Sequence, residues 1–271
     1  MRISHKQESQ PDEQAADRTN NGAVVSVANG GKPRSEQSHK SRYRAAGGVL
    51  MWLLAVAGMI ALSFFAHAHR QPLPFELSIS REIQTSITEP WIGAIFRFLT
   101  WMNDPLPDVV TVIAVLIVFV VFRWFRQGIF LALSVGVGNG IDALIGDVVQ
   151  RPRPTPNLIH VDSRLIFNSF PSGHSCHMMV FYGFLLFLTL TRPVSEWRSH
   201  WPVFLLQIWA LLNICIIGYA RLWEGEHWML DVLGGYLDGA IWMSAFIFLY
   251  LRVTNNIQER KRRKMAATQQ A

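Results

Sequence analysis

The feature that most constrains this chain is a series of long apolar segments. Residues 47–68 contain no Asp, Glu, Lys or Arg, and a helix of that length can cross the roughly 30 Å hydrocarbon layer of a membrane. Of the 271 residues, 50% are hydrophobic and only 16% are charged, which argues against an ordinary soluble domain. The sequence therefore predicts an all-α integral membrane bundle of six spans. Besides 47–68, the expected spans are 106–122, 127–146, 174–191, 201–219 and 228–251.

Two other interpretations compete with membrane spans. Each apolar run can be a buried helix of a soluble protein, and this alternative is strongest for the shortest run, 106–122. The occurrence of six such runs in one chain favours a membrane protein. Residues 66–68 look like a signal-peptidase site, but the preceding apolar stretch is longer than a signal-peptide core and follows a long polar segment. We therefore expect a retained anchor.

Lysine and arginine residues are unevenly distributed between the two sides of the expected bundle. With the N-terminus in the cytoplasm, 18 of the 25 fall on the cytoplasmic side, and every short connection on that side is basic. The outer connections are then 69–105, 147–173 and 220–227. The basic run near the C-terminus is expected to bind anionic lipid headgroups at the cytoplasmic face rather than nucleic acid.

The chain divides into a membrane domain and two polar ends. Residues 1–45 are rich in Gln, Ser, Asn, Gly and charge, and are predicted to be a disordered cytoplasmic tail. Residues 46–252 form the expected six-span domain, and residues 253–271 form a basic cytoplasmic tail. In the first outer connection, prolines and mixed polar and apolar residues indicate amphipathic helices at the interface, with Trp91 and Trp101 at headgroup level.

Cysteine usage gives no sign of a disulfide or metal framework. Cys176 and Cys215 both fall within expected spans, where small apolar packing is their expected role. Cys176 can be paired with His174 or His177 as metal ligands, but no second cluster completes a tetrahedral set. We expect no metal and no cofactor, and we expect His177 to be a packed polar residue.

Four further residues within the expected spans have candidate roles in substrate access or helix packing. Asp142 and Asp238 can line a lipid path or form hydrogen bonds between helices. Gly235 and Gly239 form a GxxxG step, for which close packing within the bundle is favoured over dimerisation.

Three polar clusters carry the functional signal. They are "QRPRP" at 150–154, "PSGH" at 171–174 and "ARLWEGEHWMLD" at 220–231. The topology places all of them at the ends of spans on the outer face, where polar residues are costly unless they have a function. Guanidinium groups in the first cluster match phosphate oxygens and stay charged at any relevant pH. Each cluster alone is a weak signal, but together they indicate one site.

The second cluster suits an anion. Pro171 and Gly173 permit a tight turn before the apolar run that begins at His174. The backbone N–H groups of Gly173 and His174 would then lie at a helix N-terminus, which attracts negative charge. Ser172 adds a hydroxyl donor.

The third cluster supplies a candidate nucleophile. His227 and Asp231 are four residues apart, so on a helix they share a face. A carboxylate that accepts the ring N–H fixes the tautomer and leaves the other nitrogen free to attack. Arg221 is expected to point toward the same anion, and Glu224 and Glu226 either tune the site or contact a substrate amine. The three clusters together predict a phosphoryl-transfer site that needs no metal.

These motifs resemble the type 2 phosphatidic acid phosphatase family, whose signature is KxxxxxxRP, PSGH and SRxxxxxHxxxD. The resemblance covers residues 100–251. It implies a six-helix fold in which His227 becomes phosphorylated and Asp231 orients it. It also implies that His174 protonates the leaving oxygen and then activates water. The implied phosphate-binding residues are Arg153, Ser172, Gly173 and Arg221.

Two positions depart from the signature. The signature Lys is Gly146 here, and the Ser before Arg221 is Ala220. The missing Lys removes one positive charge, which is worth about 1.5–3 kcal/mol of charged hydrogen bonding if nothing replaces it. Arg151 and Arg164 are the candidates to fill this gap.

The resulting expectation is a phosphatase of a lipid phosphate or diphosphate, of the phosphatidic acid, phosphatidylglycerol phosphate or undecaprenyl diphosphate class. Its active site faces the outer leaflet, and by resemblance the membrane is a bacterial inner membrane. A lipid phosphotransferase is the first alternative, because any well-placed hydroxyl can open a phosphohistidine. A vanadate-dependent haloperoxidase is disfavoured by the six spans. A non-catalytic lipid-phosphate-binding protein is the remaining alternative, motivated by Gly146.

Overall fold

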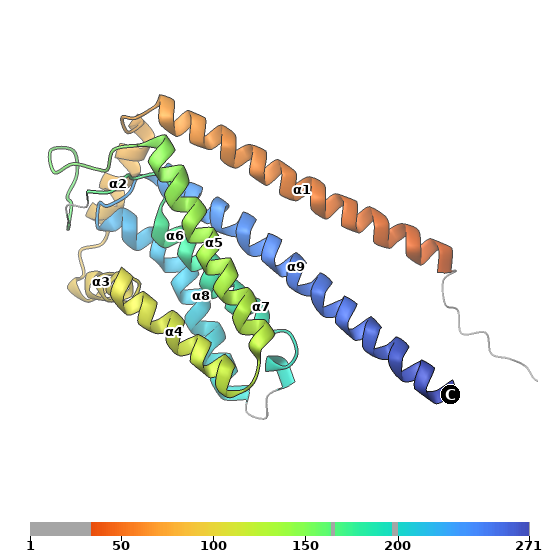
Figure 1. The fold of residues 1–271 in the computed structure, drawn as a ribbon. Coiled ribbons are helices and arrows are strands. Elements are labelled where there is room, and N and C mark those ends of the chain that lie inside the picture. Colours follow the sequence, from red (N-terminus) through yellow and green to blue (C-terminus); the bar gives the residue numbers. More distant parts are fainter. Residues whose placement is uncertain (1–33, 164–165, 197–199, 271) are drawn as a thin grey trace, which may run out of the picture. The chain divides into compact units, whose positions relative to one another are not determined.

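Helices make up the regular structure of the chain, as Figure 1 shows for a computed structural model that describes residues 34–163, 166–196 and 200–270. No strand occurs within these ranges. Residues 47–271 form one unit and residues 1–46 another, and of the predicted N-terminal tail, residues 1–33 lie outside the described residues. The elements are α1 (Arg34–Ala68), α2 (Pro74–Ser86), α3 (Pro90–Met102), α4 (Pro105–Val121), α5 (Phe125–Val149), α6 (Gly173–Met178), the π-helical turn η1 (Met179–Gly183), α7 (Phe184–Thr189), the 3₁₀ turn η2 (Val194–Glu196), α8 (His200–Trp223) and α9 (Met229–Gln270).

Proline starts three consecutive helices. Pro74, Pro90 and Pro105 stand in the first turns of α2, α3 and α4, where the missing N–H breaks no helical hydrogen bond. The segment 69–105 is therefore built from two short helices, α2 and α3, as the sequence predicts. Trp91 and Trp101 of α3 are both exposed, so their rings are free to lie at a membrane interface.

The long helices account for most of the expected spans. By length and composition, four can cross a membrane, and α3 and α4 together qualify as one more span that is bent by 64°. The remaining expected span corresponds to α6, η1 and α7 in succession. The all-helical membrane fold is confirmed, whereas the count of six stays a prediction. The four segments are Ala46–Ala68, Phe125–Val149, His200–Trp223 and Met229–Gln269.

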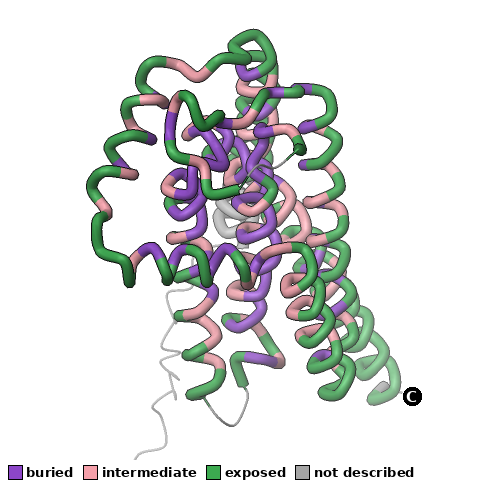
Figure 2. Tube along the Cα trace, turned by 90° about the vertical axis from the view of Figure 1, so that its left-hand side faces the viewer, coloured by how far each residue is buried: buried purple, intermediate pink, exposed green. Residues whose placement is uncertain are grey.

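The outward faces of these helices are apolar. Leu53, Val110, Leu144, Leu211 and Leu249 come from five different helices, and all are exposed. Figure 2 shows buried positions gathered in the centre of the bundle and exposed positions along its outer turns. Because lipid chains are as apolar as leucine, a bilayer accommodates such a surface, whereas water does not.

The short helix α6 lies among the long ones and carries the PSGH segment into the core. It packs against α5, α8 and α9. Close approach to α9 depends on small residues: a Cβ at Gly239 would lie 2.7 Å from the carbonyl oxygen of Cys176, and one at Gly235 would overlap the carbonyl oxygen of Ser172. The GxxxG step therefore serves packing within the bundle, as expected, and it fixes α9 beside the PSGH turn.

Both polar ends of the chain continue helices. α1 begins at Arg34 rather than at residue 46, so residues 34–45 are helical where the sequence predicts disorder. α9 continues through the basic tail to Gln270. The cytoplasmic location of both ends stays a prediction.

Candidate active site

A cavity of about 980 Å³ lies between the corner of α3 and α4, the start of α6 and the connection from α8 to α9. The three sequence clusters meet at this cavity. Two predicted site residues, Ser172 and Asp231, are fully buried and do not line it. The other five predicted site residues line it: Arg153, Gly173, His174, Arg221 and His227.

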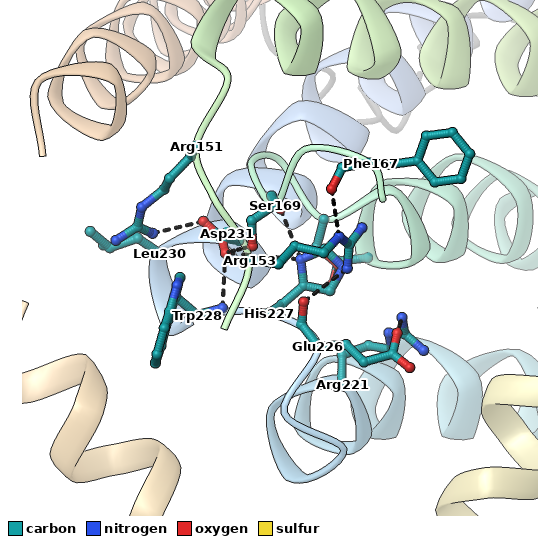
Figure 3. A network of polar contacts seen from close by, with 12 residues as sticks. Arg151, Arg153, Phe167, Ser169, Arg221, Glu226, His227, Trp228, Leu230 and Asp231 are labelled. Carbon is teal, nitrogen blue, oxygen red and sulfur yellow. Dashed lines mark hydrogen bonds and ion pairs between the residues drawn. The ribbon is translucent and has the colours of Figure 1, made fainter. Parts of the chain in front are cut away.

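The imidazole of His227 is held at both nitrogens (Figure 3). Its Nδ1 lies 2.8 Å from the carbonyl oxygen of Ser169, and its Nε2 lies 3.2 Å from Nη1 of Arg153. A carbonyl only accepts and a guanidinium only donates, so the proton is on Nδ1 and the lone pair is on Nε2. Burial, reinforced by the charges of Arg153 and Arg221, depresses the pKa of His227 well below its ordinary value, which keeps the ring neutral.

Asp231 does not bond directly to the His227 ring, so that expectation is wrong for this structure. Its Oδ2 is 3.9 Å from Nδ1 of His227, which is too long for a hydrogen bond. Oδ2 instead accepts hydrogen bonds from the Ser169 hydroxyl at 2.5 Å and from the backbone N–H of Trp228 at 2.8 Å. Oδ1 accepts one from Nη1 of Arg151 at 2.7 Å. Ser169 is therefore the link, because its hydroxyl contacts the carboxylate and its carbonyl contacts the imidazole.

The start of α9 explains this difference. The helix begins at Met229, so His227 precedes it and the four-residue helical spacing to Asp231 does not apply. Asp231 lies in the first helical turn, and its carboxylate reaches back to the N–H of Trp228, as the acidic residue of a capping box does. With the carboxylate occupied there, the ring N–H is satisfied by the Ser169 carbonyl.

Arg153 is fixed beside the nucleophile candidate by two backbone carbonyls. Its Nε donates to Phe167 at 2.9 Å, and its Nη1 donates to Glu226 at 2.8 Å. Burial lowers the pKa of Arg153 to about 10, so the guanidinium is still cationic at neutral pH. A fixed cation next to Nε2 of His227 suits an anionic ligand in the cavity.

Arg221 already has two carboxylate partners. Its Nη1 donates to Oε2 of Glu224 at 3.1 Å, and its Nη2 contacts Oε2 of Glu226. Burial raises the pKa of Glu224 to about 7, against the opposing effect of the Arg221 charge. Both contacts reduce the positive charge that Arg221 offers to an anion, which fits the tuning role, one of the two roles expected of these glutamates.

The Ser172 hydroxyl of the PSGH turn does not reach the cavity, contrary to the expectation that it binds phosphate. The backbone N–H of Ser172 donates to the carbonyl of Asp231 at 2.9 Å, and its hydroxyl accepts a hydrogen bond from Ser175 at 3.2 Å. Because Ser172 is fully buried, its hydroxyl does not face the cavity. Gly173 and His174 do line the cavity at the start of α6.

The two histidines of α6 have different surroundings. Nε2 of His174 has no hydrogen-bond partner and lies 3.7 Å from Oδ1 of Asp104, at the corner before α4. Nδ1 of His177 lies 2.8 Å from the Asn139 amide, and its Nε2 makes an ion-pair contact of 2.8 Å with Oδ1 of Asp108. Both histidines line the cavity, but His177 is the one packed closely against two protein side chains.

Comparison with known proteins identifies the group to which this arrangement belongs. Residues 127–257, which contain all three clusters, match the family model described as the PAP2 superfamily. The match covers 131 of the 271 residues, slightly less than half of the chain. The resemblance inferred from the motifs to the type 2 phosphatidic acid phosphatase family is confirmed.

Relatives of this PAP2 domain include named phosphatases. Phosphatidylglycerophosphatase B of Bacillus subtilis is 25% identical over 158 residues, which are 57% of this chain and 73% of that protein. A putative undecaprenyl-diphosphatase of Escherichia coli is 28% identical over 167 residues, covering 58% and 73% of the two chains. The crystal structure of a transmembrane PAP2 type phosphatidylglycerolphosphate phosphatase from Bacillus subtilis superposes with a TM-score of 0.54 at 21% identity, covering 74% of this chain and 96% of that chain. At that identity the likeness shows the fold.

Neither arginine proposed to replace the missing PAP2 lysine is seen to do so. Arg151 is fully buried and does not line the cavity, because it is bound to Glu76 and Asp231. Arg164 lies outside the described residues. A Cβ at Gly146 would lie 3.4 Å from the carbonyl oxygen of Phe170, so this position packs against the segment that precedes PSGH.

Three residues of the site were missed by sequence reasoning. Ser169 connects Asp231 to His227, Glu76 binds Arg151, and Asp104 lies beside His174. Ser169 has a local signal, because it stands two residues before Pro171. Glu76 lies in α2 and Asp104 lies between α3 and α4, and no spacing rule relates them to the signature motifs.

One group of potential metal ligands occurs among the described residues. Ligand atoms of Asp142, Cys176 and Asp238 lie within 4.8 Å of one another, and all three residues are buried. Their contacts are those of a polar bridge between helices: the Cys176 thiol is 3.5 Å from Oδ2 of Asp238, and Trp242 donates to Oδ1 of Asp238 at 3.1 Å. The expected hydrogen bonding between helices accounts for these contacts.

Proposed function

We propose that this chain is a metal-independent lipid phosphatase that works through a phosphohistidine at His227. The observation that carries the proposal is the state of the His227 ring. Its proton is fixed on Nδ1 by Ser169, and its Nε2 lone pair lies beside Arg153 in a cavity that also contains His174. A neutral, oriented imidazole next to a fixed cation is what nucleophilic attack on a phosphate ester requires.

The first step transfers the phosphoryl group to the enzyme. Nε2 of His227 attacks phosphorus, an N–P bond forms, and the P–O bond to the lipid alcohol breaks. His174 gives a proton to the departing oxygen, so the lipid leaves as an alcohol, or as a monophosphate if the substrate is a diphosphate. Asp104, 3.7 Å from Nε2 of His174, stabilises the protonated form of that ring.

The second step releases inorganic phosphate. His174, now neutral, takes a proton from water, and the oxygen of that water attacks phosphorus while the N–P bond breaks. His227 and His174 return to their starting protonation states. The nucleophile and the proton carrier both come from the protein, so the mechanism itself calls for no metal.

Anion binding is assigned to Arg153, Arg221 and the backbone N–H groups at Gly173 and His174. Arg153 has only backbone acceptors and the imidazole as partners, so its charge is available to phosphate. Arg221 shares its charge with two glutamates. Together with the absent lysine at Gly146, this predicts weaker ground-state phosphate binding than a site with the full signature would have.

A lipid substrate fits the position of the cavity. It lies at the ends of helices whose outer faces are apolar, so a headgroup can enter while its hydrocarbon chain stays among lipids. The relatives are named for phosphatidylglycerophosphate and undecaprenyl diphosphate. We assign the substrate to this class, with phosphatidic acid included, and place the site on the extracytoplasmic side of a bacterial inner membrane, since that orientation puts the basic segments in the cytoplasm.

Purified full-length protein in detergent tests the proposal. It is given phosphatidic acid, phosphatidylglycerol phosphate and undecaprenyl diphosphate, with a chelator present, and released phosphate is measured. We expect release from at least one lipid, and loss of about 10⁴-fold or more in His227→Ala. Tight lipid binding without turnover would instead favour a non-catalytic binding protein, and transfer to an added alcohol without net hydrolysis would favour a phosphotransferase. A strict need for a divalent metal would contradict the mechanism.

A further inference from the structure

Arg151 stands two residues before the cavity arginine, yet it has a different environment. Its guanidinium is fully buried between two carboxylates that are also fully buried. Nη2 lies 2.6 Å from Oε2 of Glu76, and Nη1 lies 3.2 Å from Oε1 of Glu76 and 2.7 Å from Oδ1 of Asp231. Figure 3 shows the side chain of Arg151 directed at Asp231. This arginine therefore contacts the carboxylate behind the nucleophile and not the cavity.

Glu76 connects this arginine to two helix starts. Its Oε2 accepts from the backbone N–H of Leu73, just before α2, at 3.0 Å. Its Oε1 accepts from the N–H of Leu230, in the first turn of α9, at 3.1 Å. The carboxylate is thus fixed by two backbone groups as well as by Arg151, and it ties the outer helix α2 to the helix that carries Asp231.

A continuous set of hydrogen bonds runs from this pair to the nucleophile. Arg151 binds Asp231, Asp231 binds the Ser169 hydroxyl, and the Ser169 carbonyl accepts the Nδ1 proton of His227. Arg151 also holds Ser169 directly, because its carbonyl accepts the Ser169 backbone N–H at 2.8 Å. Every link is fully or almost fully buried, so water does not compete for these bonds.

We propose that Glu76 and Arg151 are positioning residues for the His227 nucleophile. This inference rests on the proposed phosphatase function. The pair fixes Asp231 and thereby Ser169, so that His227 keeps its proton on Nδ1 and presents Nε2 to phosphorus. A buried ion pair is a poor stabiliser compared with apolar packing, so stability alone gives little reason for three charged groups here. An outer set of hydrogen bonds that orients a reacting imidazole gives a specific reason.

The test compares turnover with two kinds of anion binding in purified full-length protein. Arg151→Lys keeps the positive charge but loses the two-pronged guanidinium that binds both carboxylates. Glu76→Gln keeps the size and shape of the side chain but loses its negative charge. The substrate is a lipid phosphate that the unaltered protein hydrolyses. With it, we expect kcat to fall about 10–100-fold in each variant, while KM changes by less than about twofold. Inhibition by inorganic phosphate should be unchanged. Inhibition by vanadate, which adopts the five-coordinate geometry of the transition state, should weaken in proportion to kcat.

Two matched controls lie on the same outer helix. Arg81→Lys removes a guanidinium fork that donates to the Leu158 carbonyl on the surface, and Glu82→Gln neutralises an exposed carboxylate. Both should turn over substrate like the unaltered protein. If a single variant does not fold, it is replaced by the double variant Glu76→Gln with Arg151→Gln. The double variant removes one negative and one positive charge, so the net charge of the buried Glu76, Arg151 and Asp231 is unchanged.

Two results would overturn the inference. One is unchanged kcat in folded Arg151→Lys and Glu76→Gln. The other is a parallel loss of kcat, phosphate affinity and melting temperature, which would show a role in folding alone. Failure of the unaltered protein to release phosphate from any lipid is a separate result, and it would reject the proposed function and the positioning role with it.

Discussion

The two catalytic histidine candidates face the same cavity but are held in opposite ways. His227 has a partner on each nitrogen, and the groups behind it form a buried network through Ser169 and Asp231. His174 has a free Nε2 and one carboxylate, Asp104, at 3.7 Å. One ring is fixed, and the other has room to change partner.

This difference matches what the two proposed steps require. A nucleophile must present one lone pair in one direction throughout the cycle, so a fixed tautomer helps it. A residue that first donates and then accepts a proton must exchange partners between the steps, so a fully bonded ring would hinder it. Variants that alter the surroundings of one histidine and leave those of the other unchanged test this contrast.

Among variants that keep the His227 nucleophile, the largest effect is expected in His174→Ala, where the ring with the free Nε2 is removed. Phosphate release from a lipid should fall about 10²–10⁴-fold, because both proton transfers are lost. With an aryl phosphate, whose leaving group needs no proton, phosphoenzyme should still form and then accumulate. Quench-flow measurement of bound and free phosphate checks this. Absence of accumulation, with equal loss on both substrates, would remove His174 from the second step.

In the network that fixes the His227 ring, Asp231→Asn should cause the next largest loss of turnover. It leaves Arg151 buried with Glu76 alone and weakens the bond to the Ser169 hydroxyl. We expect kcat to fall about 10–100-fold and the free energy of unfolding in detergent to fall by about 3–5 kcal/mol, as for a broken buried ion pair. Chemical denaturation and kinetics on the same preparation measure both. Normal kcat with reduced stability would show that Asp231 acts only in folding.

A smaller, pH-dependent effect is expected at Glu224. Because burial raises the pKa of Glu224 to about 7, the carboxyl is protonated below that pH and leaves Arg221 with Glu226 alone. Above it, ionised Glu224 takes up part of the Arg221 charge. Inhibition by sulfate, which stays fully ionised, should therefore weaken a fewfold as pH rises from about 6 to 8. Glu224→Gln should flatten this dependence, and an unchanged slope in that variant would assign the titration to another group.

The smallest effect is expected at His177, which serves as the control for its neighbour on α6. His177→Asn removes contacts to Asn139 and Asp108 but no group assigned to the reaction. Turnover should change by less than about threefold, as measured by phosphate release. A loss comparable to that of His174→Ala would make His177 a second acid and weaken the contrast drawn between the two rings.

Much of the fold and of the cavity lining follows from local sequence patterns. Apolar segments of spanning length predict the long helices, and Pro74, Pro90 and Pro105 mark helix starts because proline fits the first turn. Arg153, His174 and His227 reach the cavity because each stands at the end of an expected span, on the same side of the bundle.

The hydrogen-bond partners could not be predicted in the same way. The spacing of His227 and Asp231 suggests a direct contact only if both lie on one helix, and α9 starts two residues too late for that. The partner of Arg151 lies on α2, and the partner of His174 lies in the α3–α4 corner. Such contacts depend on how distant helices pack, which periodicity does not encode. The count of six spans stays a prediction for a related reason: length and hydropathy do not show where a helix bends or breaks.

The most direct test of the central claim is to identify the phosphorylated residue. Purified protein is mixed with a lipid phosphate substrate, quenched in alkali, which preserves phosphohistidine, and analysed by peptide mass spectrometry. We predict a phosphoryl group on His227 that disappears when the remaining substrate is removed. In His174→Ala given an aryl phosphate, more of this phosphohistidine is predicted than in the unaltered protein. Steady turnover with phosphate on another residue, or with no covalent phosphate in either protein, would contradict the account.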